Sequence, residues 1–198
     1  MANLVADTGF SPVRNVSGSP YNGAVNPYCA AADAQAIYIG DLVTLTGATS
    51  TINGYNYPNV VQSAQGDIFV GVVTAVDPIQ GTGATGQSST IYRAASTQRI
   101  VWVCDDPNVL FEVMDVNSGT AIPLADIGFN VSIVVAQGST VTGKSAMHLD
   151  NTTQITTNTL DMKIIGITNR DDNAGGSAAA KFLVRINRHK YANQIIGI

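Results

Sequence analysis

RIVWVCDDPNVLFEVMDV, residues 99–116, consists of two apolar runs that flank a polar turn. In each run β-branched and aromatic side chains alternate with their neighbours at a period of two residues, which is typical of β-strands. The link Asp105–Asn108 has turn chemistry, because Pro107 fixes its own φ and the Asp and Asn side chains accept hydrogen bonds from nearby amides. Both faces of both runs are largely apolar. We therefore expect a central hairpin covered on both sides, with Trp102 in the core.

From Ala36 onward the chain repeats short apolar runs bounded by Gly, Asp, Asn and Pro. Asn53-Gly54 is a strong hairpin signal, and Gly71, inside an expected strand, indicates a bulge or a close approach. We find no convincing amphipathic helix. The pattern predicts an all-β fold, a compact β-barrel or β-sandwich of roughly eight to ten short strands.

Residues 1–35 differ from the rest, with three prolines, three glycines and no sustained periodicity. This segment nevertheless carries Phe10, Tyr21 and Tyr28, whereas disordered tails are usually poor in aromatic residues. We expect an extended N-terminal arm that lays these three side chains on a partner, attached to a body formed by residues 36–198. The alternative is an N-terminal strand or loop packed on its own domain.

Charged residues make up 12% of the 198-residue chain, against about 25% in ordinary soluble domains. Surface charge keeps soluble proteins apart. The low number of charged residues therefore favours a protein whose surface is buried against other protein, in a homo-oligomer or a larger assembly. A compact, neutral β protein is the simpler interpretation of the same composition.

The net charge of −4 is unevenly placed, and residues 181–198 hold four bases and no acid. Because these bases alternate with apolar residues and no aromatic stacking motif accompanies them, nucleic acid is not an expected partner. Arg185, Arg188 and Lys190 are instead a second candidate surface for contact with protein.

The chain has no apolar run long enough to span a membrane, so no membrane partner is expected. Its first ten residues lack the basic start and apolar core of a signal peptide. We expect synthesis in a reducing cytoplasm, with Cys29 and Cys104 as free thiols.

Residues 138–145, GSTVTGKS, satisfy the pattern of a phosphate-binding P-loop. A P-loop requires a helix that begins at its lysine, so that the helix amides face the phosphates. Lys144 is followed by a run rich in Thr and Asn, which does not favour a helix. Nucleotide binding is therefore a remote alternative.

The remaining polar residues do not form a pattern typical of catalysis. His148 and His189 lack the spacing of a zinc site, and the pairs Asp105-Asp106 and Asp171-Asp172 are typical of turn capping. Neither cysteine has a neighbouring histidine in the sequence. We expect no enzyme, no metal and no cofactor.

Several short motifs, taken in their order along the chain, resemble the small capsid decoration (cement) proteins of tailed bacteriophages. One set of these motifs is the run Tyr92–Arg99, followed by Asp105-Asp106-Pro107 and Phe111-Glu112-Val113. The others are Gly18–Gly23, Gly40–Val43, Gly66-Asp67 before Val70–Val73, Asp126–Gly128 and Asn187–His189. The resemblance spans nearly the whole chain.

This resemblance implies a virion structural protein that is made in the bacterial host cytoplasm and binds the outside of a capsid. It implies the major capsid protein as partner, a stabilising role at capsomer joints, and no catalysis. A homo-trimer suits a threefold joint and is favoured over a dimer. A β-rich tail or fibre protein is the alternative, although it predicts fibrous repeats, which the sequence lacks.

Overall fold

The computed structural model describes residues 3–80, 90–116 and 118–192. The prediction of an all-β fold is confirmed, since the regular elements in these ranges are twelve strands and one 3-10 turn, Leu124–Asp126. The strands are β1 Ser11–Asn15, β2 Asn26–Ala30, β3 Leu42–Ile52, β4 Tyr55–Gln62, β5 Gly71–Gln80, β6 Arg99–Cys104, β7 Val109–Met114, β8 Asn130–Val131, β9 Ile133–Val134, β10 His148–Leu149, β11 Met162–Ile167 and β12 Lys181–Ile186.

Strands β2, β4, β3, β5 and β6, in that order, close into a barrel. The first strand, β2, closes it by pairing parallel with β4 and antiparallel with β6. Alternate residues of β6, Val101 and Val103, point inward and belong to a core with Val43, Val60 and Val73. These β-branched side chains fit a small barrel interior, which accounts for the valine-rich runs in the sequence.

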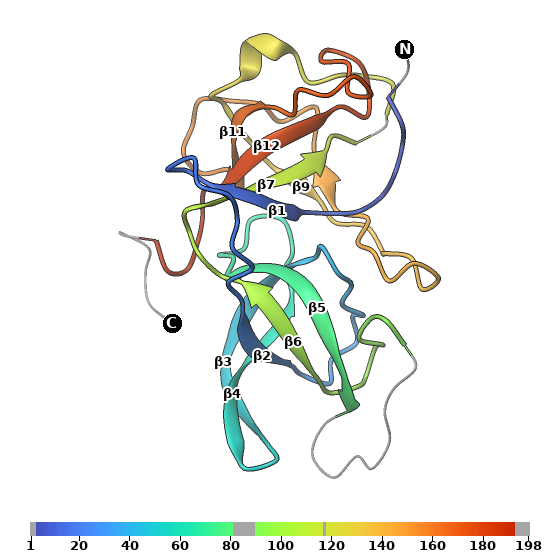
Figure 1. The fold of residues 1–198 in the computed structure, drawn as a ribbon, viewed down its shortest axis with the longest axis vertical. Helices are drawn as coiled ribbons and strands as arrows, with labels where there is room; N and C mark the ends of the chain where they lie inside the picture. The colour runs from blue at the N-terminus through green and yellow to red at the C-terminus, as the bar shows by residue number, and fades with distance from the viewer. Residues whose placement is uncertain (1–2, 81–89, 117, 193–198) are drawn as a thin grey trace.

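The other strands form a five-stranded sheet, β1-β7-β12-β11-β8, and a short ribbon of β9 and β10. Figure 1 shows this sheet above the barrel along the long axis of the molecule. Phe111 and Phe182 on its inner face share one hydrophobic cluster with Leu42 and Val72 of the barrel. The sheet and the barrel are therefore joined by a continuous core.

The prediction of a central hairpin over residues 99–116 is wrong. Strand β6 pairs with β2 and β5 in the barrel, whereas β7 pairs with β1 and β12 in the sheet. The turn Asp105–Asn108 carries the chain from one sheet to the other, and its Asp106 carboxylate accepts a hydrogen bond from the Asn108 amide at 2.8 Å. Trp102 is half-buried on the outer face of the barrel, so it is not the core anchor that the alternation predicted.

The predictions of an extended N-terminal arm and of a domain boundary at residue 36 are also wrong. Residues 11–15 form β1, the edge strand of the sheet, and residues 26–30 form β2, a strand of the barrel. Phe10 and Tyr28 are only 1% and 4% exposed. Proline did not prevent strand formation, because a residue that lacks an amide is tolerated in edge strands and at strand ends. The alternative interpretation, an N-terminal strand packed on its own domain, is confirmed.

Candidate functional site

The three aromatic residues predicted to contact a partner are tied into the protein itself. The Tyr28 hydroxyl donates a hydrogen bond to the Asp105 carboxylate at 2.7 Å and lies 3.0 Å from the hydroxyl of Tyr191. Tyr21 is half-buried against the main core, and its hydroxyl donates to the Ala24 carbonyl at 2.9 Å. Phe10 and Tyr28 are therefore not available to a partner, because the strands beside them hold them inside the fold.

The three predicted basic residues are half-buried, and all three interact with other groups of the chain itself. The Arg185 guanidinium donates from Nε to the Pro107 carbonyl at 2.9 Å, and the positive charge of Arg188 lies close enough to Asp161 to stabilise its carboxylate. The Lys190 amide donates to the Phe69 carbonyl at 2.7 Å. Through such bonds, the C-terminal segment fastens the sheet to the barrel.

Residues 138–145 form a closed turn rather than a phosphate cradle. The Ser139 and Gly143 amides donate within the turn, and the Ser139 hydroxyl accepts from the amides of Val141 and Thr142. The base of the turn is hydrogen-bonded to Ile39, whose carbonyl accepts from the Ser145 amide at 2.9 Å. No helix follows Lys144 within residues 145–192, the described remainder of the chain. Because these amides already have acceptors, they are not free to bind phosphate.

Several ionisable side chains are buried near the centre of the molecule. Burial raises the pKa of both Asp41 and Asp115 to about 6, although each carboxylate accepts backbone hydrogen bonds that oppose the shift. Burial lowers the pKa of His189 to about 4. These groups come from distant parts of the chain and anchor loops, with Asp41 holding the Tyr38 amide and the Gln62 side chain. The Ser145 hydroxyl also lies close enough to Asp41 to lower the pKa of its carboxyl group, against the effect of burial.

Apolar side chains are exposed where loops project from the body. Val141 is 85% exposed at the tip of the 139–144 turn, and Tyr55 is 69% exposed where β3 turns into β4. Leu124 and Ile127, in and beside the 3-10 turn, are also exposed. In Figure 1 the β3–β4 hairpin and the 3-10 turn lie at opposite ends of the long axis. Sequence reasoning missed these residues, although an apolar residue in the middle of a Gly-flanked polar turn, as at Val141, is a usable signal.

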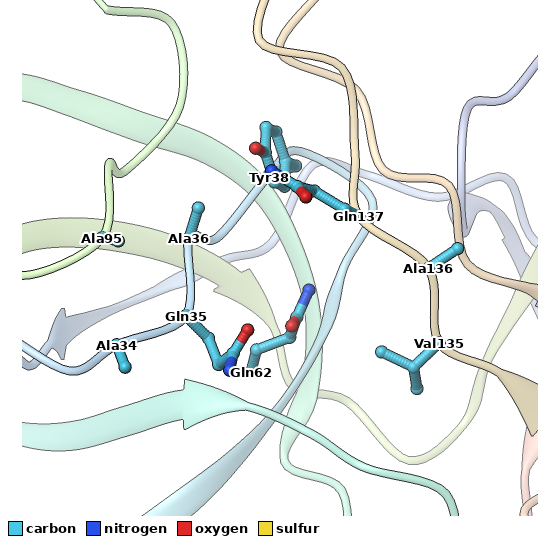
Figure 2. A pocket seen from close by; sticks show the side chains of 9 residues that line it. All are labelled: Ala34, Gln35, Ala36, Tyr38, Gln62, Ala95, Val135, Ala136 and Gln137. Carbon is cyan, nitrogen blue, oxygen red and sulfur yellow. The ribbon is translucent and has the colours of Figure 1, made fainter.

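A groove runs between the barrel and the chain that follows β9. It consists of two neighbouring pockets of about 290 and 570 Å³ that share Gln35, Gln62 and Val135. Figure 2 shows Ala34, Gln35 and Ala36 on one side of the first pocket, with Val135, Ala136 and Gln137 on the other. Its lining is rich in small and amide side chains. Such a lining can form hydrogen bonds but supplies no strong acid, base or nucleophile.

The described part of the chain contains no group of three or more His, Cys, Asp or Glu side chains that could hold a metal ion. Cys29 and Cys104 are both free, as expected, and both are buried, which raises their thiol pKa values and makes them poor nucleophiles. Within the same residues, no helix has the length and apolar character needed to cross a membrane. No protein-family model matches the chain, and neither the curated proteins nor the solved structures searched contain a match to it.

Proposed function

We propose that this chain is a structural protein of a bacteriophage virion, which binds the outside of the capsid and stabilises the joints between capsomers. The observation that carries the proposal is the placement of exposed apolar side chains on projecting loops at both ends of the molecule. A protein that holds two neighbouring subunits together needs contact points that are far apart and supported by a rigid body.

The projecting loops are supported by hydrogen bonds, which favours binding. The 139–144 turn is closed by its own amides, and the β3–β4 hairpin is paired up to Ile52 and Tyr55. A preorganised loop loses little conformational entropy when it binds, so an exposed Val or Tyr at its tip contributes more of its burial to affinity. Two such contacts on one rigid body give an avidity well above that of either contact alone.

The low charge and the sequence resemblance support the same proposal. With 14 acids and 10 bases in 198 residues, long-range repulsion between copies is weak, and dense coverage of a shell is favourable. The major capsid protein is the partner that we propose, and a homo-trimer is the assembly that suits a threefold joint. Light scattering at micromolar concentration tests the trimer separately, since a monomer would remove the oligomer and leave capsid binding open.

The proposal is tested with phage capsids assembled without this protein. Added protein is expected to co-sediment with the capsids to a saturating copy number and to raise the temperature at which they disrupt. Replacing Tyr55→Ser, Leu124→Ser or Val141→Ser should weaken binding at least tenfold, about 1.4 kcal/mol, with the melting temperature of the free protein unchanged. Ile155→Ser is the matched control, because Ile155 is an exposed apolar residue away from these tips.

Two results would contradict the proposal. One is saturable binding that none of the tip variants reduces, which would place the contact elsewhere on the molecule. The other is the absence of the protein from capsids and its presence in purified tails, which would support the alternative of a tail or fibre protein.

A further inference from the structure

The groove beside β9 is bounded by two short stretches of backbone that take no part in a sheet. Residues 34–36 lie on one side and residues 135–137 on the other. Among the described residues, the amides of Ala34, Ala36, Ala136 and Gln137 donate no hydrogen bond, and their carbonyls accept none. Backbone groups in a folded protein are nearly always paired with protein or with water, so these stretches present free donors and acceptors to the groove.

Two other strand edges in this fold contain proline, unlike residues 135–137. The edge strand β1 contains Pro12, and the projecting half of β4 contains Pro58, and proline discourages the addition of a further strand. Residues 135–137, Val-Ala-Gln, extend β9 beyond the end of its pairing with β10 and contain neither proline nor charge. This is the chemistry of an edge that is open to pairing.

Side chains in the groove add neutral hydrogen-bonding groups. Gln35, Gln62, Gln65 and Gln137 contribute amides, and Ala34, Ala36 and Ala136 leave room for another backbone to approach. The lining hydroxyls of Tyr38 and Ser63 are buried and have no hydrogen-bond partner within the described chain.

The charge of the groove restricts the occupant. Its one ionisable carboxylate, that of Asp150, already accepts hydrogen bonds from the Thr152 amide and hydroxyl at 3.0 and 2.7 Å. The lining contains no lysine or arginine. Sites for small molecules are mostly lined by apolar and aromatic side chains, whereas the single aromatic residue here, Tyr38, is 1% exposed and offers no open ring face. These features match a polypeptide backbone better than an ion, a cofactor or a sugar ring.

We propose that this groove binds an extended, uncharged peptide segment of another protein, which pairs with residues 135–137 as an added strand. The side-chain amide of Gln35 on the opposite wall, and the side-chain oxygen of Gln62, whose Nε2 already donates to Asp41, complete the hydrogen bonding of that segment. Three paired residues span about 10 Å at 3.3 Å per residue, so a segment of about four to six residues fills the groove. Small side chains on every second residue suit the alanine walls. This inference does not depend on the capsid proposal.

The test uses the full chain and a displayed library of uncharged hexapeptides composed of Gly, Ala, Ser, Thr, Val, Asn and Gln. Selected peptides are expected to bind with dissociation constants below about 1 mM and to slow hydrogen exchange of the Ala136 and Gln137 amides at least tenfold. N-methylation of alternate peptide amides should abolish binding, because strand addition relies on backbone hydrogen bonds. An otherwise identical peptide methylated on its exposed side chains is the control and should still bind.

Two variants locate the contact. Ala136→Pro removes an amide that donates no bond within the protein, and Gln35→Ala removes an exposed side chain. Each should weaken peptide binding at least tenfold with the melting temperature within a few degrees of the parent, whereas Ile165→Ser, at an exposed residue of β11, should leave binding unchanged. Failure to select any binder, protection that maps elsewhere, equal binding by N-methylated peptides, or binding of oligosaccharides alone would overturn the inference.

Discussion

Arg93 shows how a buried charged side chain can organise loops at one end of a barrel. It is 0% exposed, and its guanidinium donates to the carbonyls of Ala31 and Gln35 and to the carboxylate of Asp33. Removing one partner of a buried ion pair leaves the other partner and its acceptors unsatisfied, so Arg93→Ala should cost about 3–5 kcal/mol in the free energy of unfolding.

Arg170 provides the matched control for that substitution. It pairs with Glu112 and Asp172, but its side chain is 43% exposed. Exposed pairs are screened by water, so Arg170→Ala should cost less than about 1 kcal/mol. Urea denaturation of both variants measures the difference, and equal losses would show that Arg93 is not a structural anchor.

The buried carboxyl groups predict an unusual dependence of stability on pH. Because folding raises the pKa of Asp41 and of Asp115 from 3.8 to about 6, the folded state holds these protons more tightly. Their contribution to stability is complete below pH 4 and is lost as pH rises through 6. His189 acts in the opposite direction, because its pKa falls from 6.5 to about 4 and its contribution is lost as pH falls through that range.

Urea denaturation at pH 7 and pH 5 separates the two effects. Asp115→Asn should reduce the gain in stability on acidification relative to the parent, and His189→Gln should increase it. Identical pH dependence in all three proteins would mean that these groups are solvated in the folded state.

At the scale of a single strand, Gly71 marks the place where β5 passes the end of β6. A Cβ atom at this position would lie 2.1 Å from the carbonyl oxygen of Cys104 and 2.8 Å from its carbonyl carbon. Gly71→Ala must therefore separate two backbones and should cost at least about 1–3 kcal/mol. The sequence prediction of a close approach at Gly71 is confirmed.

Gly166 in β11 is the control, because a Cβ atom there would meet nothing within 4 Å. Replacing a glycine by alanine inside a strand should stabilise the protein by about 0.5–1 kcal/mol when space allows. Thermal unfolding of Gly71→Ala and Gly166→Ala should shift in opposite directions, and a neutral Gly71→Ala would show that β5 and β6 can separate without cost.

Strands β1 and β2 make the N-terminal segment part of the fold, which sets the result of truncation. Deleting residues 1–35 removes the edge strand of the sheet and opens the barrel between β4 and β6. The truncated chain should lose cooperative thermal unfolding, as followed by circular dichroism. Deleting residues 1–5 should keep it, because Leu4 and Val5 are exposed. Cooperative unfolding of residues 36–198 alone would contradict the closure of the barrel by β2.

What the sequence predicted about these elements depended on local chemistry. Period-two alternation and turn residues correctly located the strands that became β6 and β7, because both signals lie within a few residues. They did not identify the partners of those strands, since alternation describes a buried face and not the strand beside it. The same limit explains Phe10 and Tyr28, whose burial depends on strands about 75–100 residues away. The groove was not predictable, because its two walls, residues 34–36 and residues 135–137, meet only after the barrel and the β9–β10 ribbon have folded.

For the whole molecule, the hydrophobic cluster shared by the sheet and the barrel predicts a single unfolding transition. Leu42, Phe69 and Val72 of the barrel side pack in one cluster with Phe111 and Phe182 of the sheet. Unfolding of either the sheet or the barrel exposes apolar surface of the other. The two should therefore unfold together, with equal calorimetric and van't Hoff enthalpies of unfolding. Two resolved transitions would show that the sheet and the barrel are independent domains.

The pairing of the first strands with distant partners has a consequence during translation. Strand β2 finds its partner in β6, about 75 residues later, and at 5–20 residues per second the ribosome needs about 4–15 s to make that length. Throughout this interval an apolar, strand-forming segment lacks one of its two native neighbours, since its other partner, β4, is made earlier. Pro12, Pro20 and Pro27 lie in this segment. Proline hinders strand pairing between nascent chains that are being translated from the same mRNA. We therefore expect these prolines, which look like signs of an unstructured arm, to limit aggregation of the chain until β6 and β7 have been made.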